Sequence, residues 1–323
     1  MSADVVAPPK RRVSASALNT LRECSLRYWY NYVLKVPQTN HPKATLGSLI
    51  HSIFECLRNP RHKDQYDLIT RAPFDYTRSP AFVRLVRAWR VKHQLADNLF
   101  DPFNSLLEVG LMQTNFFHEG AIRVFEPEHE FTLLLGGGAD QSVVKGFIDS
   151  MGEYPDEFLI YDYKSAGQKY TKAEVPTLIQ ALVYQLYVWK TFRKRARVQF
   201  IMLRHAPTAR APDKHIQECP PLSEAQLGGL EMYLADMFKV MNDFGLEEAL
   251  SNPSQDQFFC SNICPFLRPQ SYYAIVKKGD ATQTPLKTFP LDKPPQSWYP
   301  DEVLIRLQHQ GCAARWNANQ SSE

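Results

Sequence analysis

Apolar residues recur three and four positions apart over long stretches of the chain, which is the spacing of one face of a helix. The first such stretch begins at Ser14, a residue type that caps helix starts, and sets leucines among tyrosine and tryptophan side chains up to Leu34. The same spacing predicts helices over 44–59, 82–100, 105–125, 176–192, 222–244 and 301–311. Much of the chain is therefore expected to be helical.

Alternating or continuous apolar residues between these helices predict strands over 126–135, 143–151, 157–165 and 198–205. Tyr154, Pro155 and Asp156 stand between the second and third strands and supply turn chemistry. These two strands are therefore expected to form a hairpin. Strands and helices in this order indicate the α/β class.

Charged residues follow the apolar runs of this hairpin. Asp149 lies late in its first strand, whereas Asp162 and Lys164 share one face of the second, with Tyr163 on the other face. Asp149 is expected to lie beside Asp162. Two carboxylates and an amine suit a Mg²⁺-dependent phosphodiesterase, because hard cations take carboxylate oxygens and an amine can orient water or hold phosphate charge. The alternative is a hairpin with surface charges. Charges at the ends of apolar strands are costly unless they are paired or used in a site, which favours the first interpretation.

Two of the predicted helices add candidate site residues. His51 follows Gly47 by four positions in the helix over 44–59, and a structural histidine is the alternative to a metal ligand. Gln180 and Tyr184 are four apart and share a face of the helix over 176–192. Tyr184 also suits a core contact, whereas a buried amide at Gln180 demands partners.

These separated motifs together resemble the PD-(D/E)xK nuclease superfamily, in particular its RecB-like branch. The motifs are Gly47 to His51, Asp149, Asp162-x-Lys164 and Gln180-x-x-x-Tyr184. The resemblance implies a restriction-endonuclease-like αβββαβ core over residues 14–275, with residues 58–125 as a helical insertion. It also implies that Asp149, Asp162, His51 and the Tyr163 carbonyl hold Mg²⁺ or Mn²⁺, that Lys164 activates water, and that Gln180 and Tyr184 position substrate.

Cysteines raise the question of a second metal centre. Iron–sulfur members of the resembled branch use one early and three late cysteines, and Cys24, Cys260 and Cys264 fit that scheme in place. A further late cysteine at the expected distance is missing, so a [4Fe–4S] cluster would need a non-cysteine ligand or the distant Cys312. A vestigial site closed by packing is the alternative.

The net charge of +3 indicates no partner by itself, so the distribution of charge matters more. The strongest basic run is a candidate DNA-phosphate grip or a solvated helix end, and it comprises Lys190, Arg193, Lys194, Arg195 and Arg197. Residues 1–13 are predicted to be a disordered basic tail, and residues 276–323 a Pro-rich linker with a C-terminal helix. No membrane-spanning run is evident, so an intracellular location, in the cytoplasm or nucleoid, is expected.

The sequence therefore predicts a divalent-metal-dependent deoxyribonuclease. The resemblance favours an exonuclease acting on single-stranded DNA or DNA ends, in recombination, repair or phage DNA metabolism. The alternative is a non-catalytic or partner-dependent DNA-binding subunit that works with a helicase or another DNA-processing protein.

Overall fold

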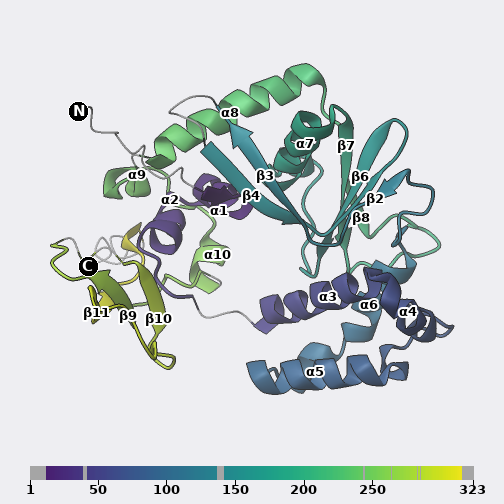
Figure 1. Ribbon diagram of the computed structural model, residues 1–323, viewed down its shortest axis with the longest axis horizontal. Helices are drawn as coiled ribbons and strands as arrows, with labels where there is room; N and C mark the ends of the chain where they lie inside the picture. Colours follow the sequence, from purple (N-terminus) through teal and green to yellow (C-terminus); the bar gives the residue numbers. More distant parts are fainter. Residues whose placement is uncertain are drawn as a thin grey trace. The chain divides into compact units, whose positions relative to one another are not determined.

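The computed structural model of the 323-residue chain describes residues 12–38, 42–136, 142–242, 244–262, 264–281, 283 and 285–314. The chain divides into two compact units (Figure 1). Unit 1 comprises Met1–Ala15 and Asn40–Ala235, and unit 2 comprises Ser16–Thr39 and Asp236–Glu323. None of the described helices is both long enough and apolar enough to cross a membrane.

Two sheets form the centre of unit 1. The larger has the strand order β2 (Arg123–Val124), β5 (Ser150–Glu153), β6 (Glu157–Lys164), β7 (Arg195–Met202) and β8 (Ile216–Cys219). Only β6 and β7 among these neighbours are parallel. The smaller sheet has the order β1 (Arg12–Ser14), β4 (Ser142–Ile148) and β3 (His129–Leu135).

The predicted hairpin is present, but its first strand is divided. The Tyr154 amide donates to the Glu157 carbonyl at 2.9 Å, and Ser150 pairs with Tyr161 across the antiparallel strands. The stretch predicted as one strand over 143–151 forms β4 in the smaller sheet and β5 in the larger, with the break at Asp149. The chain changes sheets at that residue, which brings the Asp149 side chain next to β6.

Helices lie on both faces of the larger sheet (Figure 1). Helix α7 (Ile179–Phe192) is the crossover between the parallel strands β6 and β7. Helices α3 (Pro42–Arg58), α4 (Lys63–Ile69), α5 (Pro80–His93) and α6 (Phe103–Met112) share a hydrophobic core with Tyr161 and Tyr163 of β6. Short 3₁₀ helices connect these elements at Pro60–His62, Tyr76–Arg78, Asp97–Phe100 and Val175–Thr177. The α/β, restriction-endonuclease-like fold with a helical insertion is confirmed.

The predicted helix over 105–125 is wrong in its second half. Helix α6 ends at Met112, and β2 occupies Arg123–Val124. His118 and Gly120 have φ angles of +52° and +83°, which a right-handed helix does not allow. Loop residues therefore follow α6 directly.

Unit 2 contains helix α1 (Ala15–Glu23) except its first residue. It also contains helices α2 (Ser25–Tyr28), α9 (Leu246–Ser251) and α10 (Gln257–Asn262), and a π-helical turn at Trp29–Val33. Helix α8 (Glu224–Asn242) begins in unit 1 and ends in unit 2. An antiparallel sheet has the order β10 (Lys287–Pro290), β9 (Gln270–Lys277) and β11 (Glu302–His309).

The predicted helix over 301–311 is wrong, because Glu302–His309 is the strand β11 and pairs with β9 along its whole length. The β-branched Val303 and Ile305 favour this pairing. Strand β10 lies inside the predicted Pro-rich linker. At the other terminus, residues 1–11 of the predicted tail lie outside the described residues, whereas Arg12 and Val13 belong to β1.

Candidate active site

Helix α3 delivers His51 to the carboxyl end of β6. Gly47 lets the start of the helix approach the loop after β6, since a Cβ at this position would lie 2.7 Å from the Ser165 hydroxyl oxygen. One turn later, His51 Nε2 lies 2.9 Å from the Tyr163 carbonyl oxygen. A carbonyl only accepts, so Nε2 must donate this hydrogen bond and Nδ1 faces the other way.

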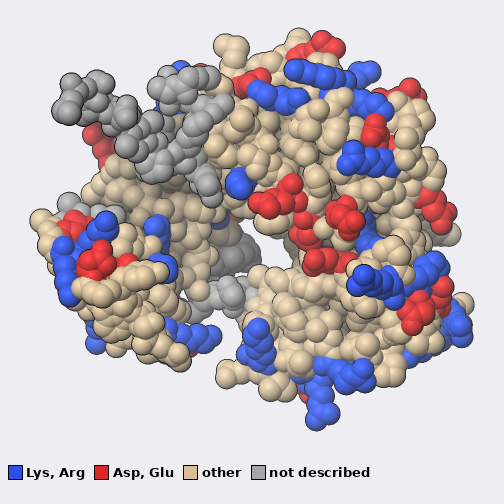
Figure 2. Space-filling view, viewed as in Figure 1, with Lys and Arg blue, Asp and Glu red and all other residues tan. Residues whose placement is uncertain are grey.

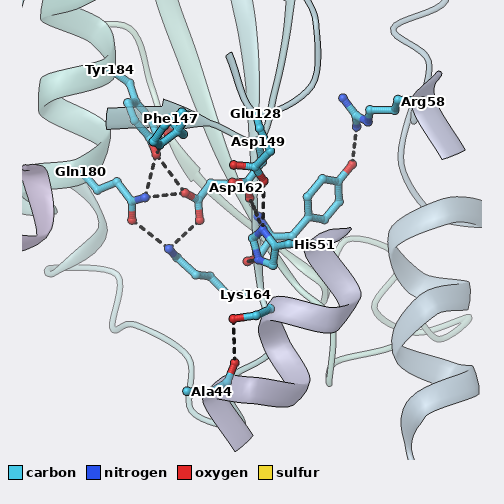
Figure 3. A network of polar contacts seen from close by, with 12 residues as sticks. Ala44, His51, Arg58, Glu128, Phe147, Asp149, Asp162, Lys164, Gln180 and Tyr184 are labelled. Carbon is cyan, nitrogen blue, oxygen red and sulfur yellow. Dashed lines mark hydrogen bonds and ion pairs between the residues drawn. The ribbon is translucent and has the colours of Figure 1, made fainter. Parts of the chain in front are cut away.

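His51 Nδ1 faces two carboxylates (Figure 3). It lies 3.4 Å from Asp149 Oδ2 and 3.6 Å from Glu128 Oε1. Asp149 Oδ2 also accepts a hydrogen bond of 2.8 Å from the Tyr163 amide. Ligand atoms of these three side chains all lie within 4.8 Å of one another, so His51, Glu128 and Asp149 could hold one metal ion.

Asp162 lies beside this group at the centre of a second network (Figure 3). Its Oδ1 accepts hydrogen bonds from Gln180 Nε2 at 2.7 Å and from the Tyr184 hydroxyl at 3.3 Å. Its Oδ2 lies 2.6 Å from Lys164 Nζ, but this close ion pair lacks the angles of a hydrogen bond. Lys164 Nζ in turn donates to Gln180 Oε1 at 2.8 Å. Gln180 and Tyr184 therefore hold Asp162 in place.

Burial and mutual charge set the protonation of these groups. Burial lowers the pKa of His51, but hydrogen bonds to Asp149 and Glu128 outweigh it and raise the pKa to about 11. Burial would raise the pKa of Asp149, but the bonds from His51 and the Tyr163 amide lower it. Burial raises the pKa of Asp162, the Asp149 charge adds to the effect, and Lys164 opposes it. The raised pKa of His51 favours a protonated imidazole whose Nδ1 faces both carboxylates.

The donor set fits a divalent cation. One imidazolium charge offsets only part of the charge of the two carboxylates, which a divalent cation would balance in full. With such a cation bound, a deprotonated His51 Nδ1 would be a ligand. Asp162 Oδ2 is one more carboxylate oxygen beside this set, but here it is ion-paired with Lys164 Nζ at 2.6 Å. The Tyr163 carbonyl, expected as a backbone ligand, accepts the His51 hydrogen bond here.

An open cleft of about 630 Å³ gives access to these residues. Figure 2 shows acidic side chains gathered on unit 1 where the sheet faces the helical insertion. Four carboxylates and two basic groups line the cleft, and they are Glu55, Glu128, Asp149, Asp162, His51 and Lys164. Phe147 lies on the same lining.

Glu128 was not among the predicted site residues, because it lies inside the strand predicted over 126–135. Strand β3 begins one residue later, at His129, and Glu128 has a left-handed φ of +52°. This conformation turns its side chain out of the strand direction and toward His51. The sequence does show a carboxylate directly before a buried strand, which could have marked Glu128 as a candidate. It shows nothing that predicts the left-handed backbone at this residue.

The basic run lies at the far end of the sheet from Lys164. Arg195 pairs with Glu157 at the start of β6, whereas Lys164 is its last residue, so about seven residues or roughly 23 Å separate them along the strand. Three members of the run are ion-paired within unit 1: Lys190 with Glu231, Lys194 with Glu153, and Arg197 with Glu157 and Glu218. The distance from Lys164 and these ion pairs count against a DNA-phosphate grip at the cleft, which stays a prediction.

The three predicted cluster cysteines converge in unit 2, and a fourth joins them. Cys24, Cys260, Cys264 and Cys312 all line one small cavity of about 20 Å³. No disulfide joins any of the six cysteines, all of which the structure describes. Cys56 and Cys219 are not among the residues that line this cavity.

Three comparisons relate the chain to known proteins. The model of the PD-(D/E)XK nuclease superfamily matches residues 12–268. No curated protein matches. The crystal structure of SSO0001 is 18% identical over 58% of this chain and 78% of that chain, with a TM-score of 0.28. A crystal structure from Eubacterium rectale, provisionally described as an exonuclease, is 13% identical over 75% of this chain and 87% of that chain, with a TM-score of 0.35. At these TM-scores neither structural likeness carries weight.

Proposed function

The chain belongs to the PD-(D/E)XK nuclease superfamily, and we propose that it is a divalent-metal-dependent deoxyribonuclease acting on single strands or DNA ends. The observation that supports this most is the juxtaposition of two groups in one open cleft. His51, Glu128 and Asp149 could together hold a metal ion, and Asp162 is ion-paired with Lys164 beside them. Recombination, repair or phage DNA metabolism is the proposed setting, with a helicase as a candidate partner.

The residues have separate roles in this proposal. A bound Mg²⁺ or Mn²⁺ would supply charge neutralisation at the phosphate and a more acidic water. Lys164 Nζ, side by side with Asp162 in the cleft, stabilises negative charge that develops on the phosphate oxygens. Gln180 fixes both members of this pair, because it donates to Asp162 and accepts from Lys164. Tyr184, also on α7, donates to the same carboxylate.

Cleavage of end-labelled single- and double-stranded DNA tests the proposal, with Mg²⁺, Mn²⁺ or EDTA. We expect metal-dependent cutting by the wild type and a loss of roughly 10²–10³-fold in Asp162→Asn and Lys164→Met. The matched control is Lys145→Met, since Lys145 lies on β4 with its ammonium on Glu130, and it should cut normally. DNA binding without cutting in every metal would support the non-catalytic or partner-dependent subunit instead.

We also propose that Cys24, Cys260, Cys264 and Cys312, which line the cavity of unit 2, bind a [4Fe–4S] cluster. The cavity of about 20 Å³ would have to widen to admit it. Within the described residues, no three of these sulfur atoms lie within 4.8 Å of one another. A single zinc ion binds sulfur at about 2.3 Å and so needs a tighter set. A four-iron cluster binds each thiolate on a separate iron, which suits wider spacing. Iron and sulfide analysis of anaerobically purified protein tests this proposal.

A further inference from the structure

The aromatic ring of Phe147 is exposed to solvent beside the metal-binding residues. Its side chain is 56% exposed, and it is the one exposed phenylalanine among the side chains that the structure describes. A single exposed apolar residue needs no explanation by itself. Its position does, because the same ring lines the cleft that contains Asp149, Asp162 and Lys164.

The strand β4 fixes the direction of this ring. Side chains alternate along a strand, so Gly146 and Ile148 face away from Phe147. Ile148 is fully buried, and a Cβ at Gly146 would lie 2.8 Å from the Phe131 ring. The Phe147 carbonyl accepts a hydrogen bond of 2.9 Å from the Tyr184 hydroxyl, which also contacts Asp162. The backbone under the exposed ring is therefore tied to the same network as the catalytic carboxylate.

The charges that line the cleft give little affinity for a nucleic acid, so a contact with the Phe147 ring could contribute much of it. The lining has four carboxylates against two basic groups, so apart from Lys164 and a bound metal it offers little attraction for phosphates. Affinity for a nucleic acid must then come largely from other contacts. An aromatic face supplies one, because base stacking on an aromatic side chain contributes about 1–3 kcal/mol per base and tolerates any sequence.

We propose that Phe147 is a stacking platform for the nucleobase next to the phosphate held at the metal-binding residues, and that it makes the cleft selective for single-stranded DNA. Bases in a duplex are already stacked and paired, whereas a single strand can present a free base face. The inference rests on the proposed nuclease function and adds the strandedness of its substrate.

Binding without cleavage tests this role. Fluorescence anisotropy would measure the dissociation constants for a labelled single-stranded oligonucleotide and for a blunt duplex, with Ca²⁺ in place of Mg²⁺. Phe147→Ala should weaken single-strand binding about 5- to 150-fold and change duplex binding by less than about twofold. Phe147→Trp should restore single-strand binding, and its fluorescence should be quenched by the oligonucleotide.

The matched control is Leu134→Ala. Leu134 is an exposed apolar residue on the same face of the neighbouring strand β3, but it does not line the cleft, so its loss should leave both constants unchanged. Unchanged single-strand binding by Phe147→Ala, or an equal loss for single strand and duplex, would overturn the inference. Failure of the wild type to cut DNA would overturn the proposed function. The binding assay would still test the role of Phe147, because it does not depend on cleavage.

Discussion

At the scale of single residues, the cleft depends on a strained backbone position. Glu128 is a non-glycine residue in the left-handed region, which costs roughly 1–2 kcal/mol. In return its carboxylate reaches within 3.6 Å of His51 Nδ1, and its amide donates to the Asp149 carbonyl at 3.3 Å. Strain of this kind persists where the surroundings impose it, which agrees with a role in holding a cation.

Glu128→Gln should therefore weaken metal binding. The substitution keeps the size of the side chain but removes one of the two charges that face His51 Nδ1. We expect Mn²⁺ affinity, measured by calorimetry without DNA, to fall roughly 10- to 100-fold. Glu130→Gln, two residues along and ion-paired only with Lys145 among the interactions described, should bind Mn²⁺ as the wild type does. Equal affinity in both variants would remove Glu128 from the ligand set.

At the scale of elements, the loop after α6 supports the hairpin through a neutral histidine. His118 is buried at 1% exposure, lies 2.7 Å from the Ser150 hydroxyl through Nε2, and stacks on Tyr161 with ring centroids 4.9 Å apart. Gly152 makes room for the ring, because a Cβ there would lie 2.6 Å from His118 Nδ1. Burial, with a smaller effect of the Arg58 charge, lowers the pKa of His118 to about 3.

The low pKa of His118 makes the stability of the fold depend on pH. The ring stays neutral in the folded chain, but in the unfolded chain it binds a proton below about pH 6.5. Protons therefore favour the unfolded chain, and the free energy of unfolding falls as pH decreases from about 6.5 toward 3. The loss is about 1.4 kcal/mol per pH unit, or roughly 2 kcal/mol between pH 6.5 and 5. His118→Gln keeps a hydrogen-bonding group for Ser150 and should lack this slope in urea unfolding. If the free energy of unfolding fell equally with pH in the wild type and in His118→Gln, His118 would not be the source of the pH dependence.

Elements with a strong local pattern were predictable, and those set by tertiary pairing were not. The apolar run ending in Asp162 and Lys164 forms β6 as expected, and Gly47 allows the helix contact that presents His51. The apolar residues of 301–311 fit both the spacing of a helix and the alternation of a strand. The segment forms a strand because it pairs with β9. The break at Asp149 likewise follows from the chain changing sheets, which no local pattern records.

At the scale of the whole chain, the two candidate centres belong to different units. The cleft is built within unit 1, and the thiol cavity within unit 2 from both ends of the sequence. Cys312 could be named from the sequence only as a distant option, because β11 brings it to the cavity. The Tyr30 hydroxyl holds this segment, since it lies 3.4 Å from the Gly311 carbonyl oxygen and accepts a bond of 3.2 Å from the Ala313 amide.

A cluster on these four thiols would therefore tie the two ends of unit 2 together. Metal binding by a folded site adds to folding free energy, and ligands far apart in sequence constrain the unfolded chain most. Cys312→Ser should lose the visible absorption of the cluster and most of about four iron atoms per chain, and trypsin should cut unit 2 faster. Cys56→Ser alters a thiol on α3 of unit 1 and should keep both properties. Full iron content in Cys312→Ser would exclude Cys312 as a ligand, and no iron in the wild type, purified without oxygen, would exclude the cluster.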